Sequence, residues 1–329
     1  MTSATETLLS RAALLLKGPV TWVMAEPCAG LRHMTGLCVV NTFRPDALAL
    51  ERMGVATAPE WPDARPATIA LTLPRQVDWA CGLIAAALDK LPAGGTLLAV
   101  ARNDRGGKRY AALLEEHFGL GWSDSKNHCR SVAVERPRDL PAVVAEWRKN
   151  YAPRRVEGTG LLAMPGTFSC DHVDKASALL ARHLPPLPGR VADFGAGWGY
   201  LSHHLLASAA PPAQADLYEA DINALAVAKE NLKSWAGKTG FYWHDLLLEP
   251  CRHSYDAVVM NPPFHDLQDA DPAIGREFIA AAARALKPGG QLWLVANRQL
   301  PYEDVLASAF AIRRAVAEEG GFKVLMGIK

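Results

Sequence analysis

The second half of the chain alternates short apolar runs with segments of helical spacing. Residues 190–194, 215–220, 241–245 and 255–260 are runs of strand length, rich in apolar and aromatic residues. Residues 200–206, between the first two runs, have the pattern of a helix, and a second helix is expected from residue 221. Strands that alternate with helices predict a doubly wound sheet, in which ligands bind beyond the carboxyl ends of the strands.

A glycine-rich turn joins the first of these strands to the first helix. The turn is Gly195-Ala196-Gly197-Trp198-Gly199, and Asp193 precedes it in the strand. Glycines let the backbone approach a ligand closely, and the helix N-terminus offers free N–H groups. A dinucleotide fingerprint would need a third glycine at position 200, which is tyrosine. The spacing is instead typical of S-adenosylmethionine sites, with a purely structural turn as the alternative.

Acidic residues follow the next two strands. Asp221 ends the strand at 215–220, about twenty residues after the glycine turn, where a ribose ligand is expected. It could equally cap the helix that follows, and Glu219 is the rival ribose ligand. Asp245, at the end of the third strand, could accept a hydrogen bond from an adenine amino group or could cap a turn. Polar groups therefore gather at one edge of the predicted sheet.

The motif Asn261-Pro262-Pro263-Phe264 directly follows the fourth strand. Its two prolines cannot donate to a strand ladder, so the strand must end at the carboxamide. The Asn261 side chain and the Pro262 carbonyl can accept hydrogen bonds from an amino group, and Phe264 offers a flat face to a nucleobase. The motif predicts chemistry at an exocyclic amine of a planar base, unless it is only a strand-ending turn.

In this order, the motifs resemble those of class I S-adenosylmethionine-dependent methyltransferases. Residues 261–265 are similar to the motif of bacterial ribosomal RNA guanine-N2 methyltransferases, and residues 166–169, 294–298 and 321–325 match the same group. The resemblance covers residues 156–329 and favours the small-subunit enzymes. The catalytic residues that it implies are Asn261, Pro262, Pro263 and Phe264. The cofactor-binding residues are Asp193, Gly195, Ala196, Gly197, Gly199, Asp221, Asp245 and Asn261.

This resemblance implies methyl transfer from S-adenosyl-L-methionine to the 2-amino group of a guanine in ribosomal RNA, with the 30S subunit favoured as partner. Asn261 and the Pro262 carbonyl would orient the amine lone pair towards the methyl group, while Phe264 would stack on the flipped base. No strong base is required, because the product cation is acidic. We expect no metal, since His203 and His204 have no partner at metal-ligand spacing.

The N-terminal half repeats the later pattern without its motifs. Residues 67–75 parallel residues 257–264, and in both halves an alanine-rich helix leads to a Gly-Gly pair and a buried strand. Thr72 and Leu73 stand where the later copy has asparagine and proline, and no Gly-x-Gly-x-Gly occurs before residue 190.

We therefore expect an α/β protein of two tandem Rossmann-like methyltransferase domains. Residues 1–150 would form a degenerate domain that supports the fold or binds RNA, and residues 151–329 the catalytic domain. The join is expected near residues 146–157, a polar stretch that contains a proline. At 329 residues the chain is long enough for two hydrophobic cores.

Composition narrows the compartment and the partner. Six scattered cysteines without a C-x-x-C pair favour a reducing compartment, and no apolar run reaches membrane-spanning length. We therefore expect a cytoplasmic protein without membrane contact, acting as a monomer. The net charge of +1 predicts no polyanion partner, but residues 102–155 contain twelve Lys/Arg against seven Asp/Glu. That excess would hold RNA, although ordinary solvated surface explains it equally well.

Other functions stay open from the sequence. The same tetrapeptide type serves enzymes that methylate large-subunit guanine-N2, adenine-N6 or glutamine amides in proteins, although the protein enzymes usually have tyrosine where this chain has Phe264. A non-catalytic RNA-binding assembly factor that retains a cofactor pocket is the alternative outside enzymes. The intact glycine turn and tetrapeptide argue against it.

Overall fold

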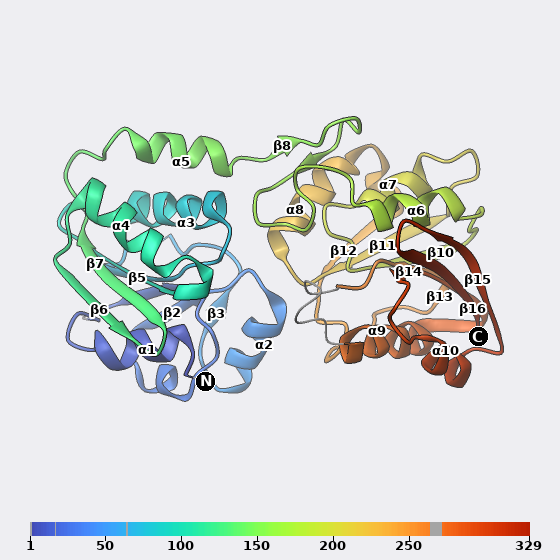
Figure 1. Ribbon diagram of the computed structural model, residues 1–329, viewed down its shortest axis with the longest axis horizontal. Helices are drawn as coiled ribbons and strands as arrows, with labels where there is room; N and C mark the ends of the chain where they lie inside the picture. Colours follow the sequence, from blue (N-terminus) through green and yellow to red (C-terminus); the bar gives the residue numbers. More distant parts are fainter. Residues whose placement is uncertain (1, 17, 64, 264–271) are drawn as a thin grey trace. The chain divides into compact units, whose positions relative to one another are not determined.

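The computed structural model describes residues 2–16, 18–63, 65–263 and 272–329, which form two compact units, Met1–Ala152 and Pro153–Lys329. Each unit contains a seven-stranded sheet (Figure 1). The strand order is β3-β2-β1-β4-β5-β7-β6 in the first sheet and β12-β11-β10-β13-β14-β16-β15 in the second. The expectation of two tandem Rossmann-like domains is confirmed, because both sheets have the same order.

In the first unit, the sheet carries helices on both faces. Its strands are β1 (Val20–Val23), β2 (Leu37–Val40), β3 (Thr57–Ala58), β4 (Thr68–Thr72), β5 (Thr96–Arg102), β6 (Trp122–Lys126) and β7 (Cys129–Glu135). Its helices are α1 (Ala4–Arg11), α2 (Arg44–Arg52), α3 (Val77–Lys90), α4 (Gly107–Phe118) and α5 (Val143–Tyr151), with short 3-10 turns η1 (Ala29–His33) and η2 (Asn103–Arg105).

The second unit has the same plan, preceded by a two-stranded ribbon. The ribbon is β8 (Arg154–Arg155) with β9 (Leu162–Ala163). The sheet strands are β10 (Arg190–Phe194), β11 (Gln214–Glu219), β12 (Thr239–Trp243), β13 (Tyr255–Met260), β14 (Leu286–Asn297), β15 (Ile312–Glu319) and β16 (Phe322–Ile328). The helices are α6 (Lys175–His183), α7 (Tyr200–Leu206), α8 (Ile222–Asn231), α9 (Pro272–Ala285) and α10 (Glu303–Ala309), with the 3-10 turn η3 (Lys233–Lys238).

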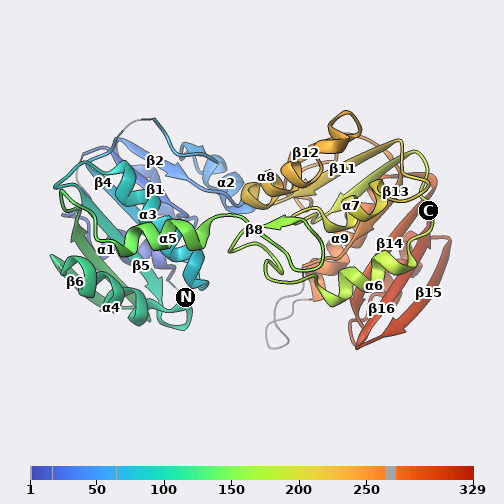
Figure 2. The same cartoon turned by 90° about the horizontal axis from the view of Figure 1, so that it is seen from above.

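In each sheet, five strands run parallel and the last two run antiparallel to their neighbours. In the second sheet the parallel strands are β12, β11, β10, β13 and β14, while β16 pairs antiparallel with both β14 and β15 (Figure 2). Because β10, β11, β12 and β13 are parallel, their carboxyl ends meet at one edge. The residues that follow these four strands therefore lie together.

Alternate side chains of the second sheet pack against different helices. Val258 and Met260 belong to the core cluster that contains residues of α9 and α10, while Ala257 and Val259 pack with residues of α6 and α7. Figure 1 shows these two pairs of helices on opposite faces of the sheet. Both faces are covered, which explains why β13 is apolar along residues 257–260 rather than alternating.

The third expected strand of the second unit is shifted. The sequence predicts residues 241–245, whereas β12 spans Thr239–Trp243. The chain turns after His244 because the Asp245 carboxylate accepts hydrogen bonds from the N–H groups of Leu247 and Leu248. Within the described part of the chain, no helix has the length and apolar character needed to cross a bilayer.

Candidate active site

The glycine-rich turn lies at the carboxyl end of β10, beside the end of β11. The N–H groups of Gly195 and Ala196 donate to the Tyr218 carbonyl at 2.9 and 3.2 Å. Gly195, Gly197 and Gly199 have φ angles of +70°, +54° and +86°, a region that side chains rarely allow. A Cβ atom placed on Gly197 would meet nothing within 4 Å. The turn therefore presents backbone beside open space in which a ligand could fit.

Asp193 is buried at the end of β10 and is only half-satisfied. Its Oδ2 accepts from the Ser202 N–H at 3.1 Å and from the Ser202 hydroxyl at 2.7 Å, which ties β10 to α7. Its Oδ1 is buried and has no hydrogen-bond partner among the described residues. Burial raises the pKa of Asp193 from 3.8 to about 7. A cation or an N–H donor from a ligand would relieve this burial penalty.

The ribose candidates at the end of β11 have different partners. The Glu219 carboxylate accepts from the N–H of Gly197 at 2.7 Å and from that of Asp221 at 2.9 Å. Asp221 caps α8 by accepting from the Asn223 N–H at 2.9 Å. Thus Glu219, the rival in the sequence prediction, is the acid that contacts the glycine turn. Burial raises the pKa of both carboxyls, that of Asp221 to about 7.

Asp245 lies just beyond β12 and is buried. Its Oδ1 accepts from Leu247 N at 2.9 Å and Leu248 N at 3.3 Å, and its own N–H donates to Glu249 Oε2 at 2.9 Å. One of its two carboxylate oxygens, Oδ1, therefore caps a turn, which is the alternative role that the sequence left open. These contacts leave its role towards an adenine amino group as a prediction.

Asn261 follows β13 and has a one-sided hydrogen-bond environment. Its Nδ2 donates to Asp174 Oδ2 at 2.9 Å and to Ser177 Oγ at 2.8 Å. Its Oδ1 is buried and, among the described residues, has no partner. In a protein interior an unpaired acceptor costs about 1–3 kcal/mol. An amide held by its nitrogen, with its oxygen left unpaired, is suited to accept a hydrogen bond from a ligand amine.

The rest of the tetrapeptide is described only in part. Pro262 is buried and Pro263 is exposed. Phe264, the predicted stacking residue, and His265 lie outside the described residues.

Sequence reasoning missed the residues that hold Asn261. Asp174 and Ser177 form the first turn of α6, and Asp174 also accepts from the Ser177 N–H at 2.7 Å as the helix cap. The pattern of an acid three residues before a serine at the start of an apolar helix could have identified the cap. It could not have revealed the contact with Asn261, which is 87 residues from Asp174 along the chain.

A second missed contact ties the glycine turn to the segment before α6. Trp198 is buried, and its indole N–H donates to the Phe168 carbonyl at 3.1 Å. The side chain of Phe168 is 62% exposed. The family resemblance singles out residues 166–169 only as a match, without a role.

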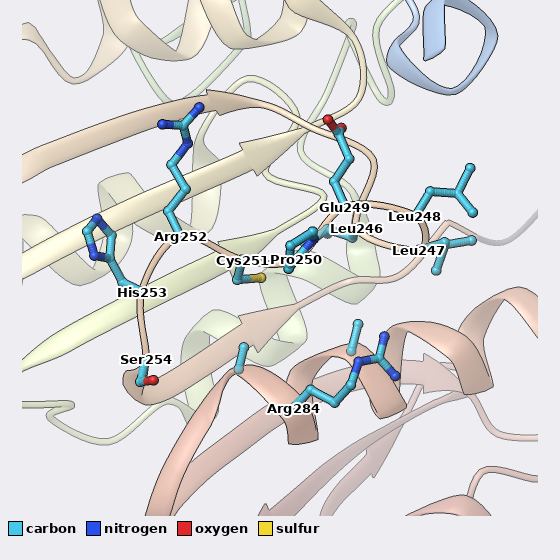
Figure 3. A pocket seen from close by; sticks show the side chains of 12 residues that line it. Leu246, Leu247, Leu248, Glu249, Pro250, Cys251, Arg252, His253, Ser254 and Arg284 are labelled. Carbon is cyan, nitrogen blue, oxygen red and sulfur yellow. The ribbon is translucent and has the colours of Figure 1, made fainter. Parts of the chain in front are cut away.

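A cavity of about 470 Å³ lies elsewhere in this unit, between the loop 246–254 and the end of α9 (Figure 3). Arg284 approaches it from the helix, on the opposite side from Cys251 and Pro250. None of the strand-end residues described above lines it. Its volume alone therefore does not make it the reaction site.

The residues at the strand ends fit S-adenosylmethionine, a cation with a ribose and an adenine. Two of the buried polar atoms without partners in the described chain, Asp193 Oδ1 and Asn261 Oδ1, belong to this edge. Asp193, Glu219 and Asp221 all have raised pKa values, so a bound cation would stabilise their ionised forms. Gly197 leaves room beside them.

The comparisons with known proteins agree with this geometry. The profile of the methyltransferase small domain family matches residues 158–326. Ribosomal RNA small subunit methyltransferase C of Shewanella sp. (strain MR-4) is 33% identical over 261 residues, which cover 78% of this chain and 75% of the relative. The protein of the same name from Shewanella baltica (strain OS155 / ATCC BAA-1091) is 32% identical over 261 residues, 78% of this chain and 74% of the relative.

A solved structure supports the fold of the whole chain. The 16S rRNA N2 methyltransferase of T. thermophilus, in complex with AdoMet and guanosine, has a TM-score of 0.75 at 24% identity, covering 95% of this chain and 88% of that chain. The family profile covers only the second unit. This agrees with the expectation that the first unit, which lacks the sequence motifs, is degenerate. The chain is a methyltransferase and belongs to the ribosomal RNA small subunit methyltransferase C family.

Proposed function

We propose that this protein transfers the methyl group of S-adenosyl-L-methionine to the 2-amino group of a guanine in small-subunit ribosomal RNA. The observation that carries this proposal is the unpaired Oδ1 of Asn261 at the carboxyl end of β13. The names of the relatives point to ribosomal RNA as the substrate. The T. thermophilus N2 methyltransferase, with AdoMet and guanosine bound, points to the base and to the cofactor. The geometry supplies the acceptor for the amine.

Methyl transfer requires the protein mainly to hold the amine in the correct orientation. An aryl amine is a weak nucleophile because its lone pair is delocalised into the ring. When Asn261 Oδ1 and the Pro262 carbonyl accept the two amine hydrogens, the lone pair is directed away from these acceptors, along the line of attack. The new N–C bond forms as the S–C bond breaks, and the amine proton then leaves to solvent. Phe264 completes this set as the proposed stacking residue for the base.

The cofactor supplies an electrophilic methyl group on a cationic sulfur. On the protein side, Gly195, Ala196, Gly197 and Gly199 provide the close backbone approach. Asp193 faces the cation with its unpaired oxygen, and Glu219 or Asp221 binds the ribose. Asp245 is the proposed acceptor for the adenine amino group.

For the N-terminal unit, residues 1–150 in the sequence prediction, we propose an RNA-holding role. Strand register places Arg102 and Lys126 on either side of Cys129, and Arg102 also pairs with Asp104, while Arg130, the next residue, faces the other side of the sheet. Lys108 is the second residue of α4, the helix that comes after β5 and η2. These residues lie at the edge where β5 ends. A basic edge of this kind would contact phosphates and fix the position of the RNA without reading its sequence.

A ribosomal RNA substrate implies a cytoplasmic enzyme. Residues 151–329 would then act as the catalytic domain. A single chain carries every residue assigned above, so we propose a monomer as the active form.

Methyl transfer to purified ribosomal subunits tests the proposal. The enzyme is incubated with labelled S-adenosylmethionine and with 30S or 50S particles lacking modification, and the RNA is digested to nucleosides for mass identification. We expect N2-methylguanosine in the 30S particle alone. N6-methyladenosine would overturn the guanine assignment, and product in the 50S particle would overturn the subunit assignment. Cofactor binding without transfer to either particle would point to an assembly factor.

A further inference from the structure

We propose that Asp174 and Ser177 are positioning residues that hold the Asn261 amide in its catalytic orientation and polarise its oxygen. This inference rests on the proposed function, in which Asn261 Oδ1 accepts from the substrate amine. Both residues accept hydrogen bonds from Asn261 Nδ2, at 2.9 and 2.8 Å. Neither would touch the cofactor or the reacting atoms, so each acts through Asn261.

The orientation of the amide follows from the chemistry of its neighbours. A carboxylate can only accept hydrogen bonds, so the group facing Asp174 must be the NH₂ of Asn261. Turning the amide over would place its oxygen against Asp174 Oδ2 and leave the NH₂ unpaired. Ser177 Oγ adds a second acceptor on the same nitrogen. With both hydrogens of Nδ2 engaged, the oxygen is the part of the amide left for a ligand.

A carboxylate on the amide nitrogen also changes the strength of the oxygen as an acceptor. Hydrogen bonds in a chain polarise one another, and the effect is larger where water is excluded. Electron density withdrawn from the N–H bonds by Asp174 accumulates on Oδ1. The attacking amine becomes positive as the N–C bond forms, so this oxygen binds it more strongly in the transition state than before.

Asp174 has a second role that any test must separate from the first. Its Oδ2 also accepts from the Ser177 N–H at 2.7 Å and caps α6. Asparagine caps helices about as well as aspartate. The Asp174→Asn variant therefore keeps the cap and removes the charge, whereas Asp174→Ala removes both.

The first experiment measures kcat, KM and melting temperature with RNA substrate and S-adenosylmethionine. For Asp174→Asn we expect an unchanged melting temperature and KM for cofactor, with kcat reduced about tenfold. Ser177→Ala should reduce kcat about fivefold, the factor that corresponds to one neutral hydrogen bond. Ser208→Ala is the matched control, because that exposed residue donates its hydroxyl to the Leu205 carbonyl of its own helix end. It should leave every parameter unchanged.

Exchanging the two side chains gives a sharper test. Asn261→Asp alone sets two carboxylates against each other at hydrogen-bond distance, which opposes ionisation of both. Adding Asp174→Asn removes one of the two charges and allows the amide nitrogen of residue 174 to face a carboxylate oxygen of residue 261, at the cost of the acceptor for the Ser177 N–H. We expect the double variant to be at least about tenfold more active than Asn261→Asp. Activity no higher than the product of the single effects would overturn the proposal, because a helix cap alone cannot produce rescue.

A readout independent of catalysis separates this inference from the proposed function. In a ¹⁵N-labelled protein, the Asn261 side-chain NH₂ resonances should be protected from solvent exchange. They should lose protection in Asp174→Ala and Ser177→Ala. Unprotected resonances in the wild type would refute the contact whatever the enzyme methylates. If the wild type shows this protection but transfers no methyl group to RNA, the proposed function fails. The inference that Asp174 and Ser177 hold the Asn261 amide then still stands.

Discussion

The two sheets share one strand order but differ at their carboxyl edges. The two sheets can be aligned by strand register. Trp22 of β1 pairs with Ala70, and Asp193 of β10 pairs with Val259. Ala70 and Val259 each lie two residues before the strand-end position, so Trp22 corresponds to Asp193. Those strand-end positions are Thr72 and Asn261. In the first sheet, the Trp22 indole donates to Thr72 Oγ1 at 3.1 Å, and Thr72 Oγ1 lies 3.0 Å from Thr5 Oγ1 of α1.

The difference lies in which hydrogen bonds are complete. At the first edge, the hydroxyl of Thr72 is shared between Trp22 and Thr5, and the Glu26 carboxylate binds the N–H groups of Ala4 and Thr5 at the start of α1. At the second edge, Asp193 and Asn261 each keep one buried oxygen without a partner in the described chain. The hydrogen bonds around Thr72 are complete, whereas Asp193 and Asn261 keep acceptors that a ligand would complete.

The backbone shows which part of the turn the two units share. By the same register, Met24 occupies the position of Gly195, and both have positive φ, +57° and +70°. Both N–H groups donate to the neighbouring strand, to the carbonyls of Val40 and Tyr218. The two units share only this first turn residue, because Cys28, at the position of Gly199, has an extended φ of −150°. Pairing with the neighbouring strand accounts for the shared residue, while the left-handed Gly197 and Gly199 are particular to the second unit.

The largest expected effect comes from the unpaired acceptor at the second edge. Asn261→Ala should lower kcat by about 10²- to 10³-fold, because a group aimed at developing charge is lost. The melting temperature should also fall modestly, because the two hydrogen bonds from Nδ2 to Asp174 and Ser177 are lost. Asn41→Ala is the matched control, because both ends of that buried amide are engaged, by Ala25 O and by Phe43 N. It should reduce stability and leave kcat of the folded enzyme unchanged.

At the first edge we expect the opposite result, a loss of stability without a loss of kcat. Thr72→Val leaves the buried Trp22 indole and the Thr5 hydroxyl without this partner, and should lower the free energy of unfolding by about 1–3 kcal/mol. Chemical denaturation measures the loss, and kcat at a temperature where the protein is folded should equal that of the wild type. A large fall in kcat with unchanged stability would show that the two edges are not divided in this way.

The second edge should also respond to pH. The pKa of Asp193 and that of Asp221 are raised to about 7 by burial, so both carboxyls are mostly protonated below pH 7 in the unliganded protein. A bound cation favours their ionised forms, so cofactor affinity should fall below pH 7, by up to about tenfold per pH unit for each coupled carboxyl.

Calorimetric titration of S-adenosylmethionine from about pH 5.5 to about pH 8, in buffers of different ionisation enthalpy, measures both affinity and released protons. Asp193→Asn should flatten part of the profile. The stability of the unliganded protein has the opposite dependence: it should fall as pH rises from about 4 to about 7, because the unfolded carboxyls ionise first. A pH-independent affinity would argue against contact between these carboxyls and the cation.

The smallest effect concerns the basic edge of the first unit. Lys108→Gln with Lys126→Gln should weaken RNA binding a few-fold and reduce the slope of log affinity against log salt by about 1 for each lost phosphate contact. Cofactor affinity should not change, because neither lysine belongs to the second unit. An unaltered salt slope would leave the first unit with a purely structural role.

Much of the fold could be predicted from the sequence because its signals are local. The apolar runs at 190–194 and 255–260 match β10 and β13, and the glycine turn appears where the spacing predicts it. The apolar pattern places the third strand two residues too late, because Asp245 caps a turn with its carboxylate instead of ending the strand. Local capping competes with strand pairing, and an apolar pattern does not reveal which one prevails.

The candidate site was predictable only as a set of strand ends. Topology brings Asp193, Asp221, Asp245 and Asn261 to one edge, as the parallel strands require. The choice between Glu219 and Asp221 depends on side-chain direction, which the sequence does not give: Glu219 accepts from the Gly197 N–H, while Asp221 caps α8. The Asp174 contact joins residues 87 positions apart, and no periodicity carries such information.

The complete bonding at Thr72 has an evolutionary consequence. Replacing Trp22 by an acid would strand the Thr72 hydroxyl beside a new buried charge, and replacing Thr72 first would strand the Trp22 indole. Each single step would lower the stability of the protein by about 1–3 kcal/mol. Trp22 and Thr72 are therefore expected to change together rather than singly, since each is a hydrogen-bond partner of the other.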